Sequence, residues 1–344
     1  MNLQKKLENL GIEETEKLDN ESIRIISYNV TEALTNSFPI IYDEYNNILV
    51  KLLNCNMYVA KITKPISRVN YIYENNSIYF DEELNLNKLN EQMIHECIHY
   101  LQDNRNIKGK LSKIGLCNFE NFSVHGLGLN EAAVQYISAK TMKYEITTTQ
   151  KYGVLLKTIS PNYYPFLTNL IEQIVFLIGE DALVKGTING TNEFEDFLLE
   201  TFEANTKKII NKFDEIIEIN NTMSLETQQE KLNMLKQQIV NNYIELQNLI
   251  FSTYFNIICP RLNTTQEIDF YRDKALYYKK LMGVELSKRF ESNSFYETYI
   301  EELEKILNSR LIKIYKNRGK NTLSVISKSR IIRMFQKIFS YFTA

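Results

Sequence analysis

The chain has 344 residues, of which 44% are hydrophobic, enough to build the core of one large domain or two smaller ones. A formal net charge of −2 argues against a nucleic-acid-binding surface spread over the chain, so we expect no nucleic-acid partner. The widely spaced cysteines form no CxxC pair, and no signal peptide or transmembrane span is visible, so we expect a cytoplasmic protein, although export outside the Sec route leaves no such mark.

The first predicted element is a β-hairpin over residues 69–80. Val69 to Tyr73 and Ser77 to Phe80 are rich in aromatic and β-branched residues, and the polar run Glu74-Asn75-Asn76 separates them. Such a pattern is typical of two strands joined by a tight turn.

A helix is predicted next, over Leu86 to Leu101. Its apolar residues recur at three- and four-residue steps, and it contains neither proline nor glycine. The acidic run 81–83 precedes it, where negative charge suits the helix dipole. The polar run 103–106 and Gly109 end it.

This helix carries the motif His95-Glu96-Cys97-Ile98-His99. Residues at i and i+4 share one helix face, so both imidazoles can bind one zinc ion, and Glu96 lies close enough to activate a metal-bound water. The alternative is an amphipathic helix with two incidental histidines. The pattern favours a zinc-dependent hydrolase, and among such hydrolases we expect a peptidase.

A catalytic zinc site usually has three protein ligands and one position for water. The best third ligand is Glu131, in the sequence Gly128-Leu129-Asn130-Glu131-Ala132 that opens a second helical pattern. Glycines 126 and 128 mark the preceding loop, and Asn130 is the predicted N-cap, which would place Glu131 in the first helical turn.

His125 is the only other histidine, and three roles are open for it. It could act in catalysis by polarising the substrate carbonyl or stabilising the oxyanion. It could replace Glu131 as the third ligand, or be a loop residue with no part in the chemistry. Gln135 and Tyr136, which follow Glu131 on the predicted helix, are candidates for orienting a ligand.

The sequence His95-Glu96-x-x-His99 followed by Asn130-Glu131-Ala132 resembles the gluzincin metallopeptidases, in which a helical Asn-Glu supplies the third ligand. The sequence Gly-Leu-Asn-Glu-Ala at 128–132 is also similar to that of peptidase-like proteins from low-GC bacteria. The resemblance covers roughly residues 68–142. It departs from thermolysin-like enzymes in its spacer, because 31 residues separate His99 from Glu131. We expect the extra length to form a loop or small hairpin.

The resemblance implies an α+β fold with a zincin-like catalytic core, followed by a mainly α-helical part. We expect the core over 1–145, a helical region over 146–304 and a basic segment over 305–344. One Zn²⁺ would be bound by His95, His99 and Glu131, with Glu96 as general base and a peptide or protein as substrate. In such folds the edge strand before the active-site helix often pairs with the substrate, so the hairpin either binds peptide or only supports the helix.

The later helices are predicted over 167–183, 193–219 and 224–254, with a turn-rich break at 186–192. A stripe from Leu232 to Ile250 could be a coiled-coil seam or ordinary core packing.

From Lys305 onward there are ten Lys or Arg residues and no Asp or Glu. A basic amphipathic segment of this kind can bind an anionic membrane surface or a partner, or dock on the acidic remainder of the chain.

Three functions stay open. The first is a zinc metallopeptidase. The second is a protease-like regulatory protein that cleaves or only binds a specific partner. The third is a zincin-shaped binding protein without turnover, a reading that the presence of Glu96 weakens.

Overall fold

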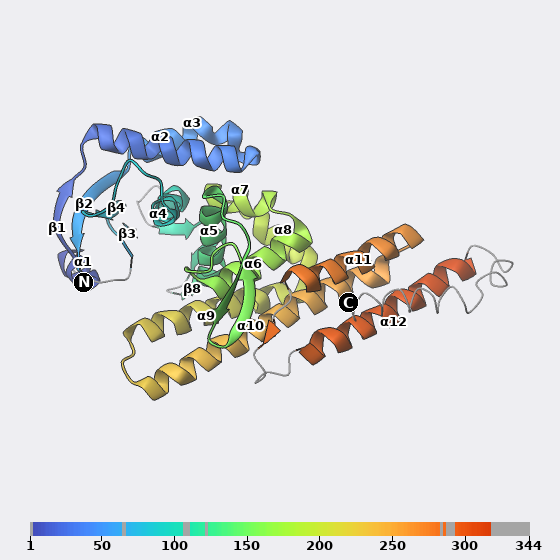
Figure 1. The fold of residues 1–344 in the computed structure, drawn as a ribbon. Helices are drawn as coiled ribbons and strands as arrows, with labels where there is room; N and C mark the ends of the chain where they lie inside the picture. The colour runs from blue at the N-terminus through green and yellow to red at the C-terminus, as the bar shows by residue number, and fades with distance from the viewer. Residues whose placement is uncertain are drawn as a thin grey trace. The chain divides into compact units, whose positions relative to one another are not determined.

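The structure is a computed structural model that describes residues 3–63, 67–105, 111–120, 123–282, 285–286 and 293–317 (Figure 1). Within these ranges helices dominate and the strands form three small sheets, which confirms the predicted α+β class. The chain divides into two compact units, Met1–Phe251 with Met282–Arg289, and Ser252–Leu281 with Phe290–Ala344. Each unit is described by itself.

The first sheet contains the predicted hairpin. Its strand order is β1-β2-β4-β3, with β2 and β4 parallel and β3 at one edge. The hairpin pairs Val69 with Phe80 and Ile72 with Ser77, as the sequence indicates. The elements of this region are α1 (Leu3–Leu10), β1 (Ile12–Lys17), α2 (Asn20–Ser37), η1 (Pro39–Glu44), α3 (Tyr45–Leu53), β2 (Asn56–Ile62), β3 (Val69–Ile72) and β4 (Ser77–Asp81).

The helix that carries both histidines of the motif is α4 (Glu91–Gln102). It begins five residues later than the predicted Leu86 because Asn90 caps it, accepting a 2.9 Å hydrogen bond from the Met93 N–H. The segment before Asn90 is instead taken up by turns, such as the one closed by the bond from Lys88 N–H to the Asn85 carbonyl. The predicted start was therefore wrong, while the helix itself is confirmed.

A second sheet fills the spacer between α4 and α5 (Leu127–Thr141). Its four strands are antiparallel and follow chain order: β5 (Asp103–Arg105), β6 (Leu111–Ile114), β7 (Cys117–Glu120) and β8 (Ser123–His125). The expected loop or small hairpin is thus a small sheet of its own.

A third sheet was not predicted. Its hairpin consists of β9 (Thr147–Lys151) and β10 (Val154–Thr158), and β11 (Glu285–Leu286) pairs with β10. Tyr152 and Gly153 turn the hairpin with positive φ angles of 51° and 85°. A two-residue turn with both φ angles positive suits an antiparallel hairpin. In the sequence, Gly153 was the residue that could have indicated this turn.

The remaining helices of this unit are α6 (Pro165–Ile178), α7 (Asp181–Asn189), α8 (Glu193–Phe202), η2 (Glu203–Asn205), α9 (Thr206–Leu225) and most of α10 (Gln229–Ile258). The predicted break over 186–192 begins too early, because Gly186 lies inside α7, but a shorter break is confirmed: Gly190, with φ of 63°, ends α7, and α8 begins at Glu193. The predicted helix over 193–219 is two helices. On α10, the stripe residues Ile239, Tyr243, Leu246 and Ile250 are buried, which favours core packing of the stripe.

The second unit contains η3 (Cys259–Arg261), α11 (Thr265–Met282) and α12 (Asn293–Asn317). Buried Arg272 on α11 donates from Nε to both carboxylate oxygens of Glu304 on α12, at 2.8 and 3.1 Å. The part of the basic segment over 318–344 lies outside the described residues. Among the residues that the structure does describe, no helix is long and apolar enough to cross a membrane.

Helix α5 lies at the centre of the first unit. It packs against α4, α6, α7 and α9 (Figure 1). Its small residues Ala132, Ala133 and Ala139 are completely buried, and so is Ile98 of α4. Small side chains let neighbouring helices approach closely, so the histidine face of α4 lies beside α5.

Candidate metal centre

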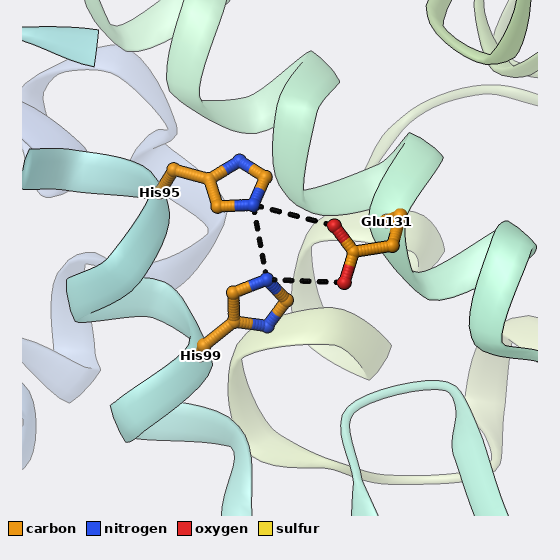
Figure 2. Close-up of side chains that lie close together, drawn as sticks. All are labelled: His95, His99 and Glu131. Carbon is orange, nitrogen blue, oxygen red and sulfur yellow. Dashed lines mark hydrogen bonds and ion pairs between the residues drawn. The ribbon is translucent and has the colours of Figure 1, made fainter. Parts of the chain in front are cut away.

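Three side chains from α4 and α5 converge on one point (Figure 2). They are His95 and His99 of α4 and Glu131 of α5, and one ligand atom of each lies within 4.8 Å of the others. The two imidazoles lie one helical turn apart with their ring centroids at 4.7 Å, and both present Nε2 to the carboxylate. The sequence thus identified all three converging residues.

The distances in this group suit a small divalent cation. Each Nε2 lies 3.4 Å from one oxygen of Glu131, and the two Nε2 atoms lie 3.0 Å apart. A tetrahedral zinc ion with bonds of roughly 2.0–2.2 Å separates neighbouring ligand atoms by about 3.3–3.6 Å. Two imidazole nitrogens and a carboxylate are also common zinc donors. The group could therefore hold a metal ion with little movement of its side chains.

Electrostatics binds the three residues together. Burial alone would raise the pKa of Glu131, but the charges and hydrogen bonds of His99 and His95 outweigh it and lower the pKa. Burial would likewise lower the pKa of His99, but the carboxylates of Glu131 and Glu96 outweigh it and raise that pKa to about 9. Without a metal, a proton on His99 therefore partners the Glu131 carboxylate at neutral pH.

Glu96 lies between the two histidines in sequence and contacts the edge strand in space. Its Oε2 accepts a 2.8 Å hydrogen bond from the backbone N–H of Tyr71 on β3. Burial raises the pKa of Glu96, against smaller lowering effects of His95, His99 and this hydrogen bond. A carboxylate with a raised pKa that is still held in one orientation suits a general base.

The outward edge of β3 is occupied by side chains of the protein. Besides the bond from Tyr71 to Glu96, Ser67 Oγ donates to the Val69 carbonyl at 2.6 Å and accepts from the Val69 N–H at 3.3 Å. Arg105 donates to the Tyr73 carbonyl. An extended peptide that joined this edge would have to replace these bonds, so they favour the supporting role of the hairpin.

The start of α5 differs from the prediction. Its N-cap is Gly126, in the left-handed region with φ of 82°, so Glu131 lies in the second turn and Asn130 is not the cap. Asp214 of α9 accepts 2.8 Å bonds from the Gly126 and Gly128 N–H groups. A Cβ on Gly128 would overlap the Phe213 carbonyl. The Gly-x-Gly sequence therefore lets α9 approach the helix that carries Glu131.

His125 lies outside the converging group. It is on β8 opposite Asn118, its side chain is exposed, and it is near enough to Asp214 to affect the pKa of that carboxyl. The structure therefore does not bring it together with His95 and His99. A catalytic role for His125 stays a prediction.

The two candidate orienting residues form other contacts. Gln135 donates to Glu91 and Ser160, and the Tyr136 hydroxyl donates to Glu180 at 3.3 Å. None of these bonds involves the three converging residues.

Tyr164 has an unusual backbone conformation and an electrostatic interaction with the site that the sequence patterns did not indicate. It precedes Pro165 at the start of α6 and adopts a left-handed conformation with φ of 45°, which is rare for a residue with a side chain and for one before proline. Burial raises its pKa, and the negative charges of Glu131 and Glu96 add to that rise.

No protein-family model, curated protein or solved structure matches the chain.

Proposed function

We propose that this protein is a zinc-dependent metallopeptidase. The observation that carries the proposal is the convergence of His95, His99 and Glu131 on one point. Two imidazoles and one carboxylate leave a fourth zinc position free, as catalytic rather than structural sites do. Cysteine ligands, which dominate structural zinc sites, are absent from this group.

The residues around the group support hydrolysis of a peptide bond. A bound zinc ion supplies Lewis acidity toward the substrate carbonyl and the attacking water. Glu96 takes a proton from that water while the water oxygen bonds to the carbonyl carbon. Glu96 then gives the proton to the leaving amine as the C–N bond breaks. The Tyr71 N–H holds the Glu96 carboxylate in one orientation between these two transfers.

A zincin-like core of the gluzincin type is part of the proposal. It is supported by the order of the elements: an edge strand, then the helix with both histidines, then a second helix with the acidic ligand. The small sheet β5–β8 accounts for the long spacer between the two helices.

A second candidate is a regulatory protein that binds a specific partner without cleaving it. The occupied outer edge of β3 favours this reading, because a peptidase that binds extended peptide through an edge strand needs its backbone groups available. Both candidates use the same metal group, so turnover separates them.

The experiment compares metal content and hydrolysis in three proteins. Wild type, Glu96→Gln and the control Glu200→Gln, an exposed residue of α8, are reconstituted with zinc and incubated with a peptide library, and the products are read by mass spectrometry. Wild type and control should bind one zinc and cleave, while Glu96→Gln should bind zinc and not cleave. Zinc-loaded wild type that cleaves nothing would favour the binding protein, and wild type without zinc would remove both readings.

A further inference from the structure

A buried pair of amide side chains lies behind His99, on the side away from Glu131. His99 Nδ1 lies 3.2 Å from Gln102 Oε1. Gln102 Nε2 donates to Asn130 Oδ1 at 3.1 Å, and Asn130 Nδ2 donates back to Gln102 Oε1 at 3.2 Å. Gln102 has no exposed surface and Asn130 is 1% exposed. We call these two residues the amide pair.

The orientation of the amide pair follows from a single backbone group. Asn130 Oδ1 also accepts a 3.0 Å hydrogen bond from the Leu116 N–H, in the turn between β6 and β7. A backbone N–H can only donate, so the Asn130 atom that faces it must be the oxygen. The Asn130 nitrogen then faces Gln102, and the Gln102 atom that receives it must also be an oxygen.

This orientation determines which nitrogen of His99 keeps its proton. Gln102 Oε1 is an acceptor, so the facing Nδ1 of His99 must carry a hydrogen. The lone pair of the neutral ring is then on Nε2, the nitrogen that faces Glu131 and His95. His95 lacks such a partner, because its buried Nδ1 has no hydrogen bond among the described residues.

We propose that Gln102, held by Asn130, is a positioning residue that fixes the ring orientation and tautomer of His99 for metal binding. The inference rests on the proposed function for its metal, but not on turnover. Gly115 has a part in it, because a Cβ there would overlap both Asn130 Oδ1 and Gln102 Nε2. The neighbouring turn must therefore have glycine to leave room for the amide pair.

The test measures the Zn²⁺ dissociation constant by competition with a chromophoric chelator. Gln102→Met keeps the length of the side chain but removes the acceptor, and it should raise the dissociation constant about 10- to 100-fold, as loss of such supporting bonds does elsewhere. Gln102→Glu still offers an oxygen to His99 and should stay within a few-fold of wild type.

The matched control is Gln173→Met on α6. Gln173 is equally buried and also donates to an asparagine, Asn169, at 2.6 Å, so its loss has a similar structural cost. It should leave zinc affinity unchanged. In zinc-loaded wild type the His99 Nδ1–H should give a protected signal in ¹H–¹⁵N spectra, and Gln102→Met should lose that protection.

The outcomes separate this inference from the proposed function. Unchanged zinc affinity in Gln102→Met, or equal weakening in the Gln173→Met control or in Gln102→Glu, would overturn the positioning role. Wild type that binds zinc but cleaves nothing would overturn the peptidase and leave the amide-pair result standing. Wild type that binds no zinc would overturn both.

Discussion

The backbone N–H of Tyr71 and the carboxylate of Glu96 are joined by a hydrogen bond of 2.8 Å, which links the edge strand to the helix that carries both histidines. The bond means that β3 does more than cover α4. It gives the carboxylate a fixed donor inside the protein, so the orientation of Glu96 does not depend on substrate. In the proposed mechanism the base is therefore aligned before a peptide binds.

Metal binding should release a proton. His99 in the metal-free protein has a pKa raised to about 9, so it is protonated at pH 7, whereas a ligating imidazole must be neutral. Zinc affinity should therefore fall about tenfold per pH unit below that pKa, and it should level off above it. Calorimetry at pH 7 in buffers of different ionisation enthalpy should show close to one proton released, and a value of zero would contradict the pairing.

The stability of the metal-free protein should depend on the same pair. The raised pKa of His99 stabilises the fold fully below its ordinary value of 6.5, and this contribution is lost as pH rises through about 9. The lowered pKa of Glu131 stabilises the fold above its ordinary value of 4.5, and this contribution is lost as pH falls. Stability from the pair should therefore be greatest between pH 4.5 and 6.5. Thermal unfolding of Glu131→Gln should show a weaker pH dependence on both sides of that window.

Asp214→Ala should loosen the start of α5. The change leaves the Gly126 and Gly128 N–H groups without their acceptor, which costs about 1–3 kcal/mol when such groups are buried. Because Glu131 lies one turn further on, zinc affinity should fall together with the free energy of unfolding. Urea unfolding and chelator competition measure the two quantities, and a stable variant with wild-type zinc affinity would show that α5 does not need this anchor.

Gly128→Ala tests the close approach of α9 directly. The added Cβ would overlap the Phe213 carbonyl, so the helices must separate, at a cost of about 1–3 kcal/mol or more. Gly186→Ala inside α7 is the control, because a Cβ there would come no closer than 3.1 Å to a neighbouring atom, whereas at Gly128 it would overlap the Phe213 carbonyl oxygen. Thermal unfolding should rank Gly128→Ala as the more damaging change, and the reverse order would contradict this account.

Tyr164→Phe should slow hydrolysis without releasing zinc. The charges of Glu131 and Glu96 act on its phenol, and in the proposed mechanism we expect that hydroxyl to donate to the oxygen that gains charge in the transition state. Loss of one such donor typically lowers kcat about 10²- to 10³-fold. Tyr163→Phe, which removes the neighbouring hydroxyl that Gln92 donates to, is the matched control and should retain turnover. Equal rates in both variants would exclude Tyr164 from the chemistry.

The sequence predicted what depends on short spacing and missed what depends on distant contacts. His95 and His99 lie one turn apart on any helix, so their convergence needed no tertiary information. Asn130 fits the N-cap pattern, but in the fold its side-chain oxygen instead accepts hydrogen bonds from the Leu116 N–H and from Gln102 Nε2. Both partners are distant from the helix start in sequence, so local spacing could not indicate them. Asp214 could not be found from sequence, because nothing near it indicates that α9 would meet Gly126 and Gly128.

The contact between Asp214 and α5 has a consequence for how the protein could be shortened. A fragment that ends at residue 145 keeps His95, His99 and Glu131, but it lacks the carboxylate that accepts from both glycine N–H groups. During synthesis the same holds for a nascent chain whose α9 has not yet emerged from the ribosome. The metal group should therefore gain its final geometry late, after more than two hundred residues have been made.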